Sequence, residues 1–141
     1  MSVAIYNTVW LIDDDELANY VNEKIISSQH FAKSTVVFTT VDEAVASLDL
    51  AAGQKGTGFP DIVFLDMEMP GLDGWDFIEA FQRLSPDVKK QCKLYMLSSS
   101  IDKSDAERAM AYEDICCFIS KPLTTDVLQT IMDSKPGSSQ S

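Results

Sequence analysis

Carboxylates follow two apolar runs of the chain, and their spacing predicts a cation-binding site. Asp13 and Asp14 come directly after the run at 9–12, and Asp66 comes directly after the run at 62–65. Runs this short and this apolar are typical of strands covered on both faces, as in a parallel sheet. If both strands end at one edge of a sheet, the carboxylates meet there, and their repulsion requires a shared cation or a proton. Such an oxygen-rich site suits Mg2+, which keeps several waters and leaves room for a phosphoryl group.

Alternating strands and helices are needed to position these side chains. Helical patterns separate five apolar runs, which lie at 9–12, 35–38, 62–65, 94–97 and 115–119. Thr40 and Glu43 have the spacing of a capping box at the start of the second helix. Asp73 and Asp102 are placed to cap the third and fourth helices. Five strand–helix units in this order predict a doubly wound α/β sandwich with right-handed crossovers.

The helical patterns themselves rest on apolar residues three or four positions apart. Leu17, Val21 and Ile25 share one face of the first pattern, and Leu128 and Ile131 mark the last. In doubly wound sheets, ligands gather at the carboxyl ends of the strands. The predicted site therefore also receives the two polar residues that follow the fourth and fifth runs, Ser98 and Lys121.

Length and composition indicate one small domain. The chain has 141 residues, 45% of them apolar, which is enough for one hydrophobic core. We expect the domain to span residues 1–133 and residues 134–141 to form a flexible tail. The net charge of −11 argues against nucleic-acid binding by this domain, because phosphate contacts require a basic face. No run is long enough to span a membrane and no export signal is visible, so we expect a cytoplasmic protein with reduced cysteines.

Four segments together resemble the receiver domain of two-component response regulators. They are residues 11–14, 64–74, 96–99 and 118–122, and the likeness extends from about Thr8 to Met132. The resemblance implies a flavodoxin-like three-layer sandwich with a five-stranded parallel sheet in the order 2-1-3-4-5. It also implies a stand-alone receiver, since few residues follow Ile131.

The resemblance assigns roles to the strand-end residues. Asp66 would be the phosphoacceptor, a carboxylate nucleophile that forms an aspartyl phosphate. Asp13, Asp14, Asp66 and the backbone carbonyl of Glu68 would bind Mg2+. Two further side chains would contact the phosphoryl oxygens, Lys121 by charge and Ser98 through its hydroxyl.

The family likeness also implies a switch and partners. Movement of Ser98 toward phosphate would let Phe118 turn inward and would change the surface of the fourth helix, fifth strand and fifth helix. The peptide between Lys121 and Pro122 is the place where the family usually has a cis bond. A sensor histidine kinase or a histidine phosphotransfer protein would donate the phosphoryl group, with no turnover of an external substrate. The downstream target is not specified by the sequence, and a homodimer stays open.

Two other functions are compatible with parts of this pattern. A degenerate receiver would act only as a protein-interaction module, although the acidic set with Ser98 and Lys121 is complete. A haloacid-dehalogenase-type phosphatase also uses an Asp nucleophile after a strand, but it needs Asp and Thr where this chain has Glu68 and Pro70. Two nearby polar residues have structural interpretations: Asp15 caps the first helix, and His30 lies on the surface.

Overall fold

The computed structural model describes residues 5–53, 59–67, 74–98, 107, 112, 115–120 and 123–133. Its strands form one parallel sheet in the order β2-β1-β3-β4-β5. The strands are β1 (Tyr6–Ile12), β2 (Ala32–Phe38), β3 (Ile62–Asp66), β4 (Lys93–Ser98) and β5 (Ile115–Ser120). The predicted fold class and strand order are therefore confirmed.

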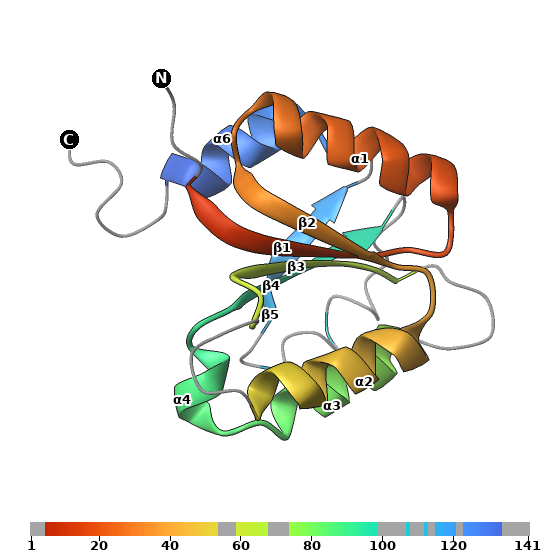
Figure 1. The fold of residues 1–141 in the computed structure, drawn as a ribbon, viewed down its shortest axis with the longest axis vertical. Helices are drawn as coiled ribbons and strands as arrows, with labels where there is room; N and C mark the ends of the chain where they lie inside the picture. The colour runs from red at the N-terminus through yellow and green to blue at the C-terminus, as the bar shows by residue number, and fades with distance from the viewer. Residues whose placement is uncertain are drawn as a thin grey trace.

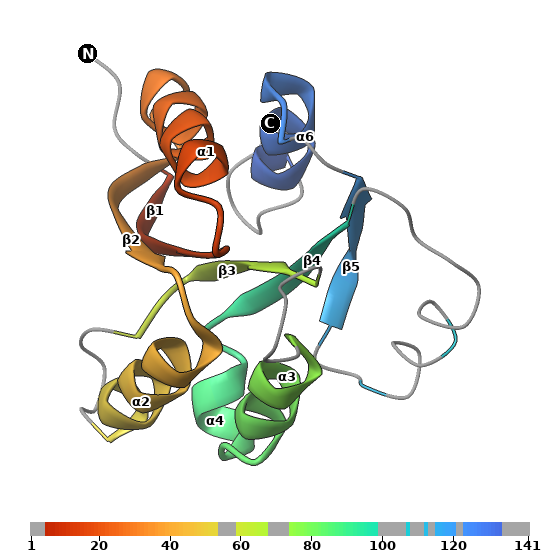
Figure 2. The same ribbon diagram turned by 90° about the vertical axis from the view of Figure 1, so that its right-hand side faces the viewer.

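Helices cover both faces of the sheet (Figures 1 and 2). On one face lie α1 (Glu16–Ser28) and α6 (Thr125–Asp133). On the other face lie α2 (Val41–Ala52), α3 (Gly74–Gln82) and the short α4 (Pro86–Lys89). Each face has its own buried cluster, with Phe77 and Ile78 in one and Ile26 and Leu128 in the other. The helix predicted from Asp102, the Asp73 cap and the side chains of Cys116 and Cys117 lie outside the described residues.

Two helix starts depend on the predicted caps. The Asp15 carboxylate accepts hydrogen bonds from the backbone N–H groups of Leu17 and Ala18, at 3.0 and 3.4 Å. The Thr40 hydroxyl accepts from the N–H of Glu43 at 3.2 Å. Each bond satisfies a donor that the first helical turn cannot satisfy itself. Both caps are thus confirmed.

The first helix lies with most of its predicted apolar face toward solvent. Leu17 is 70% exposed and Val21 is 42% exposed, whereas the inward positions include Asn19, Asn22 and Ile26. The helix was correctly predicted, but its apolar stripe is not its main core-facing side. The contacts of Asn19 described below place a polar side chain against the sheet at this point.

One irregularity occurs where β4 pairs with β5. Leu94 pairs with Ile115, but the next residue, Tyr95, pairs with Cys117. The pairing therefore skips one residue of β5, in the manner of a β-bulge. Beyond the shift, Met96 pairs with Phe118, and both belong to the core on the α3 side of the sheet.

Candidate functional site

Three carboxylates meet at the carboxyl edge of the sheet. Asp13, Asp14 and Asp66 each offer an oxygen, and these oxygens lie within 4.8 Å of one another. The approach follows from the topology, because β1 and β3 are adjacent and Ile12 pairs with Leu65. The side chains of Asp13 and Asp66 are buried, at 3% and 2% exposure, while Asp14 is exposed. Two carboxylates of the cluster are thus buried, and the third is open to solvent.

Asp13 is held at three of its atoms. Its backbone N–H donates to the carbonyl of Phe38 at 3.0 Å, which extends the pairing of β1 with β2. Its Oδ1 accepts from the N–H of Asp15 at 2.9 Å. Its carbonyl accepts from Nδ2 of Asn19 at 2.8 Å in a buried contact. Asn19 was missed by the sequence analysis, because the apolar stripe of Leu17 and Val21 indicated a different inward face for this helix.

The donor set fits a hard divalent cation. Two unit charges 4 Å apart interact with about 4 kcal/mol at the effective dielectric constant of a partly buried site. Asp13 and Asp66 are both buried, so their repulsion is less screened than that of surface carboxylates. Carboxylate oxygens are the ligands that Mg2+ uses, and the exposed Asp14 leaves the site open to water and to a phosphoryl group.

The chain beyond Asp66 is fixed to the neighbouring strand. The N–H of Met67 donates to the carbonyl of Leu97 at 3.0 Å, directly before Ser98. Gly74 begins α3 against this segment, and a Cβ there would lie 2.7 Å from Sδ of Met67 and 3.3 Å from the carbonyl oxygen of Asp66. A side chain at this position would push the flexible end of Met67 aside and would be tight against the backbone at the end of β3, so glycine suits this approach best.

Of the remaining predicted site residues, the structure describes Ser98 and Phe118. Ser98 is 4% exposed at the end of β4, where it pairs with Ser120. Phe118 is partly buried on β5 and packs against the core on the α3 side. Glu68, Lys121 and Pro122 lie outside the described residues.

A groove of about 230 Å³ borders the carboxylates. It runs along α1 and reaches the end of β4, and its lining combines polar and apolar side chains: Asp13, Asp15, Leu17, Ala18, Val21, Asn22, Leu97 and Leu123. The exposed side chains of Leu17 and Val21 are part of this lining. The site therefore has an apolar border on the α1 side.

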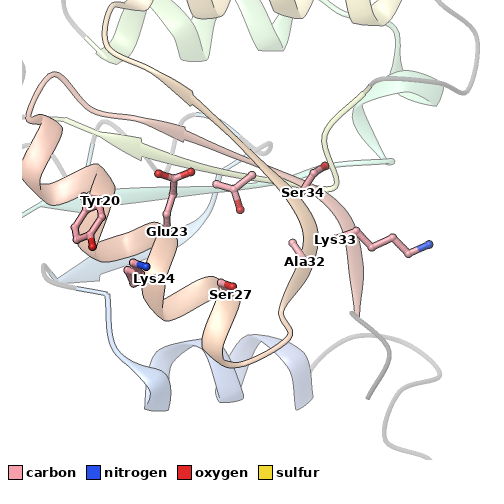
Figure 3. Close-up of a pocket in the computed structure, with 8 residues that line it drawn as sticks. Tyr20, Glu23, Lys24, Ser27, Ala32, Lys33 and Ser34 are labelled. Carbon is pink, nitrogen blue, oxygen red and sulfur yellow. The ribbon is translucent and has the colours of Figure 1, made fainter. Parts of the chain in front are cut away.

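A larger cavity lies elsewhere, between α1 and the edge strand β2 (Figure 3). It measures about 410 Å³ and is lined by Tyr20, Glu23, Lys24, Ser27 and residues 32–35. Figure 3 shows the side chain of Lys33 extending away from α1. None of the three clustered carboxylates lines this cavity, so its size does not make it part of the acidic site.

Comparison with known proteins decides the family. Residues 9–133 match the model of the response regulator receiver domain. The chain belongs to this family. Among solved receivers, a two-component response regulator from Cytophaga hutchinsonii superposes with a TM-score of 0.79 at 32% identity, over 89% of this chain and 93% of that one. A response regulator receiver protein from Dyadobacter fermentans gives a TM-score of 0.75 at 27% identity, over 89% and 94% of the two chains.

Curated relatives of this receiver include longer proteins. A protein-glutamate methylesterase/protein-glutamine glutaminase from Chromohalobacter salexigens is 37% identical over 115 residues. The match covers 81% of this chain but only 29% of that protein. The shared part is the receiver, so the similarity gives no ground for assigning methylesterase chemistry to this chain. Among the described helices, none has the length and apolar character needed to cross a membrane.

Proposed function

We propose that this receiver accepts a phosphoryl group on Asp66 in a Mg2+-dependent reaction. The donor is a phosphohistidine of a sensor kinase or of a histidine phosphotransfer protein. The observation that carries the proposal is the buried Asp66 carboxylate, which lies with Asp13 and Asp14 in one oxygen cluster of a receiver-family chain. That the receiver works in the cytoplasm and without an attached output domain stays a prediction.

The proposed reaction is a phosphoryl transfer between two side chains. An oxygen of Asp66 attacks phosphorus, the P–N bond of the donor breaks, and its electron pair remains on the imidazole nitrogen, which takes up a proton. Bound Mg2+ would neutralise negative charge on the phosphoryl oxygens. Asp13, Asp14 and the backbone carbonyl of Glu68 would hold the metal together with Asp66. Since little other chemistry is needed, the protein contributes mainly positioning and electrostatics.

The surroundings of the cluster support a protein donor. Leu17 and Val21 expose apolar surface in the groove that also contains Asp13. Exposed apolar side chains beside a polar site are typical of protein contact surfaces. We propose that the donor protein covers this border of α1 while its phosphohistidine reaches Asp66.

The proposed output is a change of surface after phosphorylation. Lys121 and Ser98 would contact the phosphoryl oxygens, and Phe118 would turn into the space that Ser98 leaves. The change would reach the surface around β5 and the helices on either side of it, where a downstream protein or a second copy of the chain would bind. The small exposure of Ser98 and the partial burial of Phe118 are compatible with this pairing.

Intact mass after incubation with acetyl phosphate tests the proposed function. We expect a labile gain of one phosphoryl group that requires Mg2+ and is absent in Asp66→Asn. Asp49→Asn removes an exposed carboxylate of α2 and serves as the control that should be labelled like the wild type. Failure of both acetyl phosphate and a phosphorylated protein donor to label Asp66 would favour an interaction module. Continuous phosphate release from phosphoesters would favour a phosphatase.

A further inference from the structure

We propose that Asn19 is a positioning residue for the metal-binding turn. In this inference, which rests on the proposed function, the Asn19 side chain fixes the backbone of Asp13 so that the carboxylates of Asp13 and Asp14 face Asp66. Asn19 contacts neither the metal nor the phosphoryl group in this role. It acts only through the shape of the acidic turn.

The contact itself is well defined. Asn19 is 3% exposed, and its Nδ2 donates to the Asp13 carbonyl at 2.8 Å. The orientation of the carboxamide follows from chemistry, because a carbonyl can only accept and must therefore face the NH2 group. The backbone N–H of Asn19 also donates to the carbonyl of Asp15 at 3.0 Å. One residue of α1 thus holds both ends of the turn that contains Asp14.

Among the contacts of Asp13 described above, the one from Asn19 has a side-chain donor, which a mutation can remove. The contacts from the Asp13 N–H to Phe38 and from the Asp15 N–H to Asp13 have backbone donors. Without a clamp on the carbonyl, repulsion among the carboxylates would favour arrangements in which the turn opens. Mg2+ binding would then be weaker, because part of its free energy would be used to bring the carboxylates back together.

Packing alone gives no reason for asparagine at this position. The Oδ1 atom of Asn19 is buried and has no hydrogen-bond partner in the part of the chain that the structure describes. A buried polar atom without a hydrogen-bond partner destabilises the folded state. Leucine has a similar shape and would avoid that cost, but it would leave the Asp13 carbonyl without its side-chain donor. Replacement by leucine therefore removes the buried Oδ1 acceptor and also removes the Nδ2 donor from the Asp13 carbonyl, and we expect it to disturb the turn more than the overall stability.

Asn22 provides a matched control. It is also asparagine, lies one turn further along the inward side of α1 and is buried. It lines the groove beside Asp13, yet its side chain makes no hydrogen bond within the described part of the chain. Asn22→Leu changes the same residue type in the same helix but leaves the hold on Asp13 intact.

Titration of the full chain with Mg2+, measured by calorimetry, tests the inference. We expect Asn19→Leu to raise the Kd for Mg2+ roughly tenfold, as removal of outer-shell partners of metal ligands does. Asn22→Leu should leave the Kd within about twofold of wild type, well below that outer-shell effect. Urea unfolding of each protein shows whether stability and Mg2+ affinity change separately. Asn19→Ala removes the same donor without adding a methyl group to the core, and it takes the place of the leucine variant if that variant does not fold.

A second measurement separates positioning from structural damage. We expect the labelling rate of Asn19→Leu with acetyl phosphate to fall at low Mg2+ and to return to the wild-type rate at saturating Mg2+. An unchanged Kd in a folded Asn19 variant, or an equal loss in Asn22→Leu, would overturn the role of Asn19 alone. If the wild type itself binds no Mg2+, the proposed metal site fails, and the positioning role fails with it.

Discussion

Helices α1 and α3 make an instructive pair, because each follows a strand that ends at or directly before a site carboxylate. The inward face of α3 is apolar and includes the fully buried Phe77 and Ile78. The inward face of α1 carries Asn19, while Leu17 and Val21 point largely to solvent. Helix α3 thus packs its inward face into the core, whereas α1 places a polar side chain against the acidic turn and leaves apolar side chains exposed beside it, as the proposed roles of α1 require.

The largest expected effect concerns the packing of α3. Phe77→Ala removes a fully buried ring from the core and should lower the free energy of unfolding by about 3–5 kcal/mol. Urea unfolding followed by circular dichroism measures this loss. Gln82→Ala changes an exposed residue of the same helix and should alter stability by less than about 0.5 kcal/mol. A loss below about 1 kcal/mol for Phe77→Ala would contradict the structural role of α3.

An intermediate effect is expected at the start of α1. Asp15→Ala removes the acceptor for the N–H groups of Leu17 and Ala18, and the loss should be about 1 kcal/mol. Equilibrium unfolding in urea provides the measurement. Glu16→Ala removes an acidic charge from the same turn without removing a cap. A smaller loss in Glu16→Ala attributes the effect to the hydrogen bonds, whereas equal losses would attribute it to charge near the helix N-terminus.

The smallest effect on stability, but a clear effect on transfer, is expected on the outer side of α1. Leu17→Gln changes a side chain that is 70% exposed, so the free energy of unfolding should change by less than about 0.5 kcal/mol. Labelling by acetyl phosphate should be unchanged, because a small donor does not need the apolar border. Transfer from a phosphorylated histidine protein, followed on a gel, should slow.

Leu50 of α2 is the matched control for this experiment. Its side chain is 69% exposed and does not line the groove beside Asp13. Leu50→Gln should transfer at the wild-type rate. Equal slowing in both variants would place the donor contact elsewhere. It would contradict the proposed role of the exposed apolar side of α1 in binding the donor.

Much of the fold could be predicted because strand and helix signals agreed with the final packing. The five apolar runs became five strands, and Asp15 and Thr40 became helix caps. The start of β1 was placed too late, since Asn7 and Thr8 interrupt the apolar pattern. Their backbone N–H groups donate to the carboxylate of Asp61, a contact between segments distant in the sequence that no local pattern shows.

The candidate site was only partly predictable, for a related reason. That Asp13 and Asp66 approach each other follows from parallel strands ending at one edge, and strand-end spacing carries that information. The rotation of α1 does not follow from its apolar stripe, because the contact of Asn19 with the Asp13 carbonyl works against that stripe. The four-residue α4 had visible signals, the cap Ser85 and the first-turn Pro86, but too few apolar positions to define a helix.

The residue of β5 that is skipped in its pairing with β4 limits where this chain can be joined to another receiver in a chimeric protein. Side chains alternate between the two faces of a sheet, so one residue more or less in β5 would carry Phe118 to the opposite face. A chimeric protein joined near residues 115–117 must therefore keep the residue count of this chain. Otherwise an intact acidic edge would be combined with a last strand whose Phe118 lies on the wrong face of the sheet.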